Sequence, residues 1–305
     1  MIRISDAFTF KDSAGILYST TNLLMSLRDG ASIYAVAGID DHVIVSFPSE
    51  NVPVLYEIRK MTECSICEPN ILWPQRELYS APGEKFCGFL ANKVETSAQF
   101  YSLQQLMEQR KQSTTPSAQE IQCYLTTGLH LAQCIHTIHS TEKNYVIGNI
   151  EPEEFYVDNN NNIYYYSVYR SCQHPYSVTN HWYLSPELIS CPDSSTFYSE
   201  ESDSFAFALI LFQLLTGIYP FLNQNMHKTL TIEQLQSYML DGISIYYEEN
   251  SPLCIQTEQL LTEISPAIAD RFRCTFDYCG SESYTQNRPS IEDWIDTLQK
   301  NVTRW

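Results

Sequence analysis

The sequence has few basic residues for its length. Of its 305 residues, 18 are Lys or Arg and 36 are Asp or Glu, which gives a formal net charge of −18. A nucleic acid partner is not expected, because binding a polyanion requires a basic surface. The charge is compatible with a protein partner that has a basic surface, and it also favours solubility.

Long apolar segments are lacking as well. The most apolar run, 205–221, is interrupted by Gln213, Thr216 and Gly217. It is too short for a membrane span and better explained as a buried helix. The first residues, Met1 to Asp6, lack the apolar core of a secretory signal. We therefore expect a cytoplasmic protein that has no membrane partner.

The ten cysteines do not form the pattern of a zinc site. Only Cys64 with Cys67, and Cys274 with Cys279, lie close together in the sequence. A structural zinc ion usually needs four ligands in two close pairs. His136 and His139, the other candidates, fall on a predicted helix. We expect reduced thiols, as is typical of the cytoplasm, and no metal.

What the chain does contain is a β-rich part followed by a helical part. Apolar residues make up 44% of the sequence, enough for a sizeable core. Alternating or short apolar runs predict strands, and one helix is expected among them, near 54–64. The predicted strands cover 32–37, 43–47, 77–79 and 86–90.

From about residue 100 the pattern becomes helical. Capping signals predict helices that begin after Ser117, Thr231 and Ser290, and Ser265-Pro266 marks another start. Ser202 or Asp203 is the predicted cap of the apolar helix 205–215. A short hairpin, 155–157 with 163–168, is expected around the polar turn 158–162. We predict an α+β protein with two lobes, 1–93 and 94–305.

Five short motifs occur in the order found in protein kinases. Residues 146–155 follow the outline of the catalytic loop, and 182–187 end in Ser-Pro-Glu, like the Ala-Pro-Glu segment. An Asp opens the apolar helix in 202–209, Gly-Ile-Tyr-Pro-Phe follows in 216–221, and Arg-Pro-Ser stands in 287–290. The chain thus resembles a protein kinase over roughly residues 20–300. This resemblance implies a bilobal protein-kinase-like fold, with a small β-rich lobe and a larger helical lobe.

Within the kinases, the chain is most similar to the bacterial kinase-like family found with tellurite-resistance-type and helix-hairpin-helix proteins. Residues 71–74, 88–90 and 147–149 carry this likeness. The resemblance also gives three residues a structural role. Glu187 should pair with Arg288 inside the large lobe, and Asp203 should hold the backbone of the catalytic loop.

The same alignment shows that the chemical positions of a kinase are altered. Non-glycine residues occupy the phosphate loop, the strand lysine is missing, and the partner glutamate has lost its lysine. The base, the metal-binding Asn and the metal-binding Asp are also replaced. Ser26, Arg28 and Ala31 stand at the glycine positions, Val45 (or Ser46 with a one-residue slip) at the strand lysine, and Glu57 at its partner glutamate. In the catalytic loop, Asn149 stands at the base, Glu151 at a position that is often lysine, and Glu154 at the metal-binding Asn. Ser167 stands at the metal-binding Asp.

These replacements remove the groups that phosphoryl transfer requires. The amide of Asn149 cannot take a proton as a carboxylate can, and the hydroxyl of Ser167 is a poor Mg²⁺ ligand. Glu151 adds negative charge where the γ-phosphate would lie. Glu154 could coordinate Mg²⁺. A solvated acidic turn is the preferred interpretation of Glu151 and Glu154.

We therefore predict a pseudokinase without cofactor that binds ATP weakly or not at all. It would act as a protein-binding scaffold or allosteric regulator in signalling. The alternative is an enzyme of altered chemistry, a nucleotidyl transferase or atypical phosphoryl transferase that uses Glu151 and Glu154. The sequence does not decide whether another small ligand binds.

Overall fold

The computed structural model describes residues 8–49, 52, 55–66, 68–81, 84–94, 100–113, 115–143, 145–148, 150–170, 181–190, 198–221, 231–277 and 288–305. The chain divides into two compact units. The first, here called the barrel unit, comprises Met1–Ala98, Thr141–Lys143 and Tyr164–Cys172. The second, the helical unit, comprises Gln99–Ser140, Asn144–Ile163 and Gln173–Trp305.

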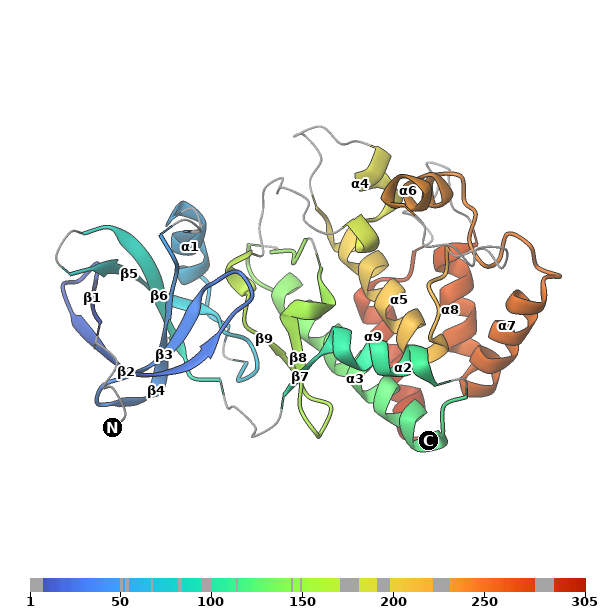
Figure 1. Ribbon diagram of the computed structural model, residues 1–305, viewed down its shortest axis with the longest axis horizontal. Helices are drawn as coiled ribbons and strands as arrows, with labels where there is room; N and C mark the ends of the chain where they lie inside the picture. Colours follow the sequence, from blue (N-terminus) through green and yellow to red (C-terminus); the bar gives the residue numbers. More distant parts are fainter. Residues whose placement is uncertain are drawn as a thin grey trace. The chain divides into compact units, whose positions relative to one another are not determined.

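The barrel unit contains six antiparallel strands that close on themselves in the order β1-β2-β3-β4-β6-β5 (Figure 1). Each strand contributes one side chain to a shared buried core: Phe10, Tyr18, Val36, Ile44, Leu78 and Leu90. The strands are β1 (Thr9–Asp12), β2 (Leu17–Ser26), β3 (Ser32–Val36), β4 (Ile39–Ser46), β5 (Pro74–Ser80) and β6 (Phe86–Asn92).

Asp12 is the residue at which the barrel closes. Its side chain is 1% exposed, and its Oδ1 accepts hydrogen bonds from the amides of Ala14 and Ile16 in the turn to β2. Its Oδ2 accepts from Tyr18 Oη and from Arg76 Nη1 on β5, the latter at 3.0 Å. Burial raises the pKa of Asp12, but these hydrogen bonds and the Arg76 charge outweigh it and lower the pKa.

This closure corrects the fold predicted from the sequence. β1 pairs with β2 on one side and with β5 on the other, so the strands form a ring. A protein-kinase small lobe instead contains an open sheet. The predicted protein-kinase-like bilobal fold is therefore wrong, although the chain is α+β. The sequence prediction contained neither β1 nor β2, and without them the ring cannot be recognised.

One helix and one tryptophan stabilise the side of the barrel. α1 (Leu55–Thr62) packs on β5, where the sequence predicts a helix. The indole Nε1 of Trp73 donates to the carbonyl oxygens of Met61 at 3.0 Å and Cys64 at 2.9 Å. Because Trp73 immediately precedes β5, these bonds fix the end of the helix to the start of the strand.

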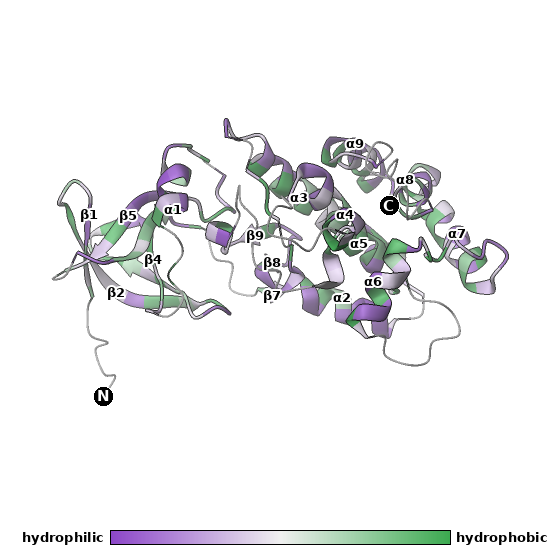
Figure 2. Ribbon diagram, turned by 90° about the horizontal axis from the view of Figure 1, so that it is seen from above, coloured by the Kyte–Doolittle hydropathy of each residue, from purple (hydrophilic) through white to green (hydrophobic). Residues whose placement is uncertain are grey.

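The helical unit is built around α5 (Glu200–Thr216), which is buried at every position from Ser202 to Leu215. Figure 2 colours α5 largely as hydrophobic, as expected for a helix covered on all sides. The other helices are α2 (Leu103–Gln112), α3 (Ala118–His139), α4 (Pro186–Ser190), α6 (Ile232–Leu240), α7 (Pro252–Ile264), α8 (Pro266–Phe276) and α9 (Ile291–Val302). α2, α3, α7 and α8 contact α5, and α9 packs along α3.

The helix starts follow local hydrogen bonding. Ser117, Thr231 and Ser290 each form a capping box, as the sequence predicts. The predicted cap of α5 is wrong, because Ser199 caps that helix. Asp203 lies within the first turn, and its carboxylate binds another segment described below. Within the described residues, no helix combines the length and apolar composition that a membrane crossing requires.

A small sheet of β7 (Tyr101–Ser102), β8 (Phe155–Val157) and β9 (Ile163–Tyr165) completes the fold. The predicted hairpin corresponds to β8 and β9. Its turn is held by Asp158, whose Oδ1 accepts from the amides of Asn160 and Asn162. Short 3-10 turns occur at η1 (Pro152–Glu154), η2 (Val168–Arg170) and η3 (His181–Tyr183).

Candidate functional site

The predicted site residues fall into two groups, one in each unit. Ser26, Arg28, Ala31, Val45, Glu57 and Ser167 belong to the barrel unit. Glu151, Glu154, Glu187, Asp203 and Arg288 belong to the helical unit. Asn149 lies outside the described residues. Each group is described within its own unit.

In the barrel unit, the position of the expected lysine is part of the core. Val45 lies on β4 between Ile33 of β3 and Phe89 of β6, and none of its surface is exposed. Gly88 lies opposite Ser46, and a Cβ atom there would stand 2.1 Å from the Val45 carbonyl oxygen. Strands β4 and β6 therefore approach closely at this point. Glu57 is half-buried on α1.

The segment that aligns with a phosphate-binding loop is a tight turn between β2 and β3. The amide of Leu27 donates to the Ala31 carbonyl at 2.7 Å, and the amide of Gly30 donates to the Leu27 carbonyl at 3.0 Å. The amide of Ala31 donates to Asp29 Oδ1 at 3.1 Å. Gly30 has a φ of +88°, which favours glycine. All three backbone amides thus donate hydrogen bonds to acceptors within the turn.

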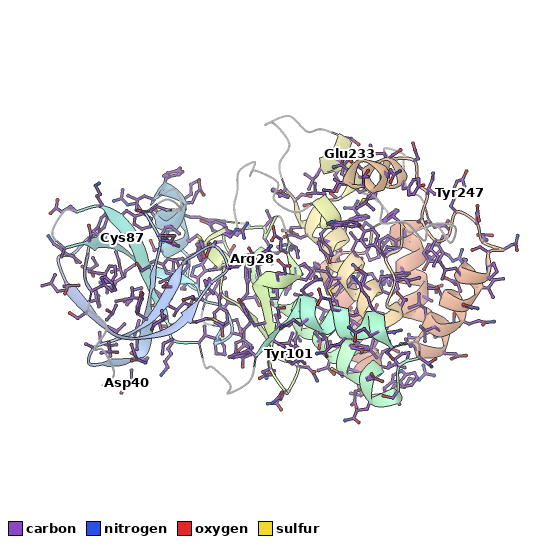
Figure 3. All side chains as sticks on the ribbon, viewed as in Figure 1. Arg28, Asp40, Cys87, Tyr101, Glu233 and Tyr247 are labelled. Carbon is purple, nitrogen blue, oxygen red and sulfur yellow. The ribbon has the colours of Figure 1, made fainter. Side chains whose placement is uncertain are left out.

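The exposed side of this turn carries Ser26 and Arg28. Figure 3 labels Arg28, whose side chain extends from the turn. Asp29 is half-buried and directs its Oδ2 towards a tyrosine, as described next. Ala31 is fully buried.

A cluster of aromatic rings lies at the end of the barrel beside this turn. Tyr169 is 3% exposed, and its ring centroid is 4.9 Å from that of Phe47 and 5.9 Å from that of Phe89. Its hydroxyl donates to Asp29 Oδ2 at 2.5 Å. Burial and the Asp29 charge raise the pKa of Tyr169 well above its usual range. We call Phe47, Phe89, Tyr169 and Asp29 the Tyr169 cluster.

Ser167 stands two residues before Tyr169 and is also buried. Its carbonyl oxygen accepts a hydrogen bond from the Arg170 amide at 2.9 Å, within the turn η2. The position that should supply a metal-binding carboxylate therefore belongs to a turn that orients Tyr169. The sequence did not predict the hydrogen bond from Tyr169 to Asp29. Tyr169 aligns with the Gly of the kinase Asp-Phe-Gly motif, and this bulky replacement was the available signal.

In the helical unit, Asp203 holds the backbone of the loop before residue 149. Its Oδ2 accepts from the Ile147 amide at 2.7 Å, and its Oδ1 accepts from the Gly148 amide at 2.9 Å. Gly148 has a φ of +85°, and a Cβ there would stand 3.2 Å from the Tyr198 ring. This is the contact that the sequence predicts for Asp203.

His139 is a third partner of this fully buried carboxylate. Its Nε2 lies 2.8 Å from Asp203 Oδ2. Burial disfavours the charged imidazole, but the hydrogen bond and the charge of Asp203 outweigh it and raise the pKa of His139. His139 is thus a buried charge partner of Asp203, which the sequence did not reveal.

Arg288 and Glu187 form the ion pair that the sequence predicts. Arg288 Nη1 and Nη2 donate to the two carboxylate oxygens of Glu187 at 2.9 and 3.1 Å. Nη1 also donates to the Glu201 carbonyl, and the guanidinium lies over the Phe205 ring at 4.9 Å. Burial raises the pKa of Glu187, but Arg288 outweighs it and lowers the pKa. Arg288, which stands just before α9, thus contacts the first turns of α4 and α5.

Glu151 and Glu154 differ from the prediction of a solvated acidic turn. They are 5% and 6% exposed, so that interpretation is wrong. Glu151 precedes η1 and Glu154 ends it, and the Glu154 amide donates to the Glu151 carbonyl at 3.0 Å. Both side chains are buried at the tight turn that starts at Pro152. The described part of the chain contains no cluster of three or more His, Cys, Asp or Glu residues that could hold a metal ion.

Comparison with known proteins assigns no family. A scan against protein-family models finds no match to this chain. A search of curated proteins finds no matching relative.

Proposed function

We propose that the chain is a catalytically inactive, pseudokinase-like module that acts in the cytoplasm by binding another protein, as a scaffold or an allosteric regulator. The Tyr169 cluster is the main observation in favour. Nucleotide phosphates and their metal ion need open space lined by cations, carboxylates and amides. Near the positions that resemble a kinase site, Asp29, Phe47, Phe89 and Tyr169 are instead joined by buried ring packing and an internal hydrogen bond.

The neighbouring positions support the same proposal. The amides of Leu27, Gly30 and Ala31 donate within their own turn, so they are not directed at a phosphate. Val45 is an uncharged residue of the barrel core. The proposal rests on the loss of chemistry at the positions that the kinase-like motifs identify.

The fixed shape of the helical unit is what a partner protein would recognise. Asp203 fixes the loop at Ile147 and Gly148, and Arg288 fixes α4 to α5. These contacts fix the backbone of the helical unit, and they position neither a catalytic base nor a metal ligand. A net charge of −18 favours a partner with a basic surface. Free thiols such as buried Cys64 and Cys254 agree with a cytoplasmic location.

A nucleotide thermal-shift panel tests the proposal. Purified protein is melted with ATP or GTP, each with Mg²⁺ or Mn²⁺, and phosphoryl transfer to itself and to a general acceptor protein is measured in parallel. An active protein kinase serves as the positive control. We expect unchanged melting temperatures and no transfer.

Metal-dependent phosphorylation that disappears in Glu154→Ala would overturn the proposal. Stabilisation by a nucleotide would favour the alternative, a nucleotidyl or atypical phosphoryl transferase that uses Glu151 and Glu154. Replacing each by Gln should then reduce the nucleotide-induced shift, whereas a matched change at exposed Glu142 should not.

A further inference from the structure

The outward face of α7 carries an open pocket of about 620 Å³. Ile255, Glu258 and Glu263 line it from α7, together with Glu249 from the preceding loop and Arg273 from α8. Cys254, which is 2% exposed, forms part of its floor. We call this the α7 pocket. None of these residues belongs to the site described above.

The positive charge of Arg273 is already compensated within the protein. Its guanidinium lies 3.3 Å from Glu249, 3.2 Å from Glu258 and 3.7 Å from Asp277. It also lies over the ring of buried Tyr246 at 5.1 Å. Three carboxylates around one cation leave an excess of negative charge at the pocket.

Glu263 adds to this excess, because it is exposed and forms no ion pair with the described residues. The surrounding sequence adds to the negative electrostatic potential at the pocket. Between positions 231 and 270 there is no Lys or Arg, whereas seven residues are acidic: Glu233, Asp241, Glu248, Glu249, Glu258, Glu263 and Asp270. A ligand of the α7 pocket should therefore be cationic.

The pocket also offers an apolar contact. Ile255 is 45% exposed, and the polar residues Glu258 and Gln259 follow it one turn along the helix. Tyr247, labelled in Figure 3, is 65% exposed just before Glu248 and Glu249. Exposed aliphatic and aromatic side chains beside carboxylates are typical of surfaces that bind peptides with mixed apolar and basic residues.

The spacing along α7 sets the length of the ligand. Ile255 and Glu263 are eight residues apart, which is about 12 Å along a helix at 1.5 Å per residue. An extended peptide covers this distance with about four residues. A free cation would not use Ile255, and a purely apolar segment would leave Glu263 without compensation.

We propose that the α7 pocket binds a short, extended, basic segment of a partner protein. An aliphatic side chain of that segment packs on Ile255, and Lys or Arg side chains further along the segment pair with Glu263 and lie in the negative potential of Glu249 and Glu258. This inference deepens the proposed function, since it names the partner's chemistry and places its contact on α7.

Fluorescence anisotropy with the labelled peptide Lys-Arg-Leu-Lys-Arg tests the inference. The test protein is the full chain with Ile255→Ser and Glu263→Gln, which leaves Arg273 and its partners intact. The matched control carries Ile232→Ser and Glu233→Gln on α6, where Ile232 is 38% exposed and Glu233 is labelled in Figure 3. Both variants lose the same residue types and the same charge.

We expect the α7 variant to bind the peptide about tenfold more weakly than the unchanged protein. The α6 control should remain within about twofold. The peptide Glu-Asp-Leu-Glu-Asp should not bind. Hydrogen exchange should show protection of α7 when the basic peptide is present.

Equal weakening in the two variants would overturn the inference, because it would indicate general attraction to an acidic protein. Failure of the basic peptide to bind the unchanged chain would also overturn it. Neither result would change the interpretation of the nucleotide thermal-shift panel, which tests the proposed function. Conversely, nucleotide-dependent transfer would overturn the proposed function while peptide binding at α7 could stand.

Discussion

Replacement of Arg288 by alanine should destabilise the helical unit strongly. The Arg288 side chain is 1% exposed and makes three hydrogen bonds, two to Glu187 and one to the Glu201 carbonyl. Alanine would leave a half-buried carboxylate and a carbonyl without their donor. It would also remove the guanidinium from the face of Phe205.

The size of the effect follows from the exposure of the two partners. Breaking a buried ion pair on one side costs about 3–5 kcal/mol. Glu187 is 31% exposed and can regain part of its hydration, so we expect about 3 kcal/mol, at the lower end of that range. For a unit of this size, such a loss lowers the melting temperature by roughly 6–12 °C.

Arg273→Ala provides a matched control. Arg273 also pairs with carboxylates and also lies over an aromatic ring, but its side chain is 37% exposed. Its removal should cost about 1 kcal/mol or less. Adding Glu187→Gln to Arg288→Ala should recover about 1 kcal/mol, because the uncompensated charge is then gone.

The assay is thermal unfolding of each variant, followed by far-ultraviolet circular dichroism and by calorimetry. Because the protein has two compact units, the unfolding transition of each unit is fitted separately. If Arg288→Ala melts at the same temperature as the unchanged protein, or no lower than Arg273→Ala, the reasoning about this ion pair is refuted.

Two further predictions concern the buried polar contacts. Tyr169→Phe keeps the ring but loses the hydrogen bond to Asp29, so chemical denaturation should show a loss of about 1.5 kcal/mol, while Tyr169→Ala should lose about 3–5 kcal/mol; equal losses would count against the hydrogen bond. The pKa of His139 is raised above its usual 6.5, so the stability it contributes is complete below that pH and is lost as pH rises through the folded-state pKa. His139→Gln should remove this decline from denaturation curves measured between about pH 6 and 9, and an unchanged decline would contradict the assignment.

Local signals in the sequence predicted several helix starts. A serine or threonine followed three residues later by an acid or amide gave the starts after Ser117, Thr231 and Ser290, because capping depends only on neighbouring residues. The start of α5 was misassigned because the role of Asp203 depends on residues that are distant in the sequence. Asp203 has the chemistry of a cap, but its carboxylate is used by Ile147 and Gly148, which are far away in the sequence.

The barrel could not be predicted in the same way. β2 carries Ser19, Thr20, Thr21 and Asn22 in its middle and exposes much of its length, so it lacks the alternation that marks a half-buried strand. β1 is only four residues long. Closure depends on the pairing of β1 with β5 and on the bond from Arg76 to Asp12, both of which join residues more than sixty positions apart.

The candidate site was predicted in part. Motif order gave the contacts of Asp203 and of Glu187 with Arg288, because each depends on residue identities that the chain retains. Burial of Glu151 and Glu154 was missed, since an acidic run normally faces solvent. The hydrogen bond of Tyr169 to Asp29 spans 140 positions, and no local pattern marks it.

The position of β1 has a consequence for self-association. A strand without a neighbour presents unpaired amides and carbonyls to other molecules. If the first dozen residues were removed by proteolysis, β2 and β5 would each lose a neighbour. The stretch of β2 that pairs with β1 carries Leu17, which is 63% exposed, so the trimmed protein would offer an apolar strand edge to another copy. The N-terminal strand thus protects the molecule against edge-to-edge aggregation.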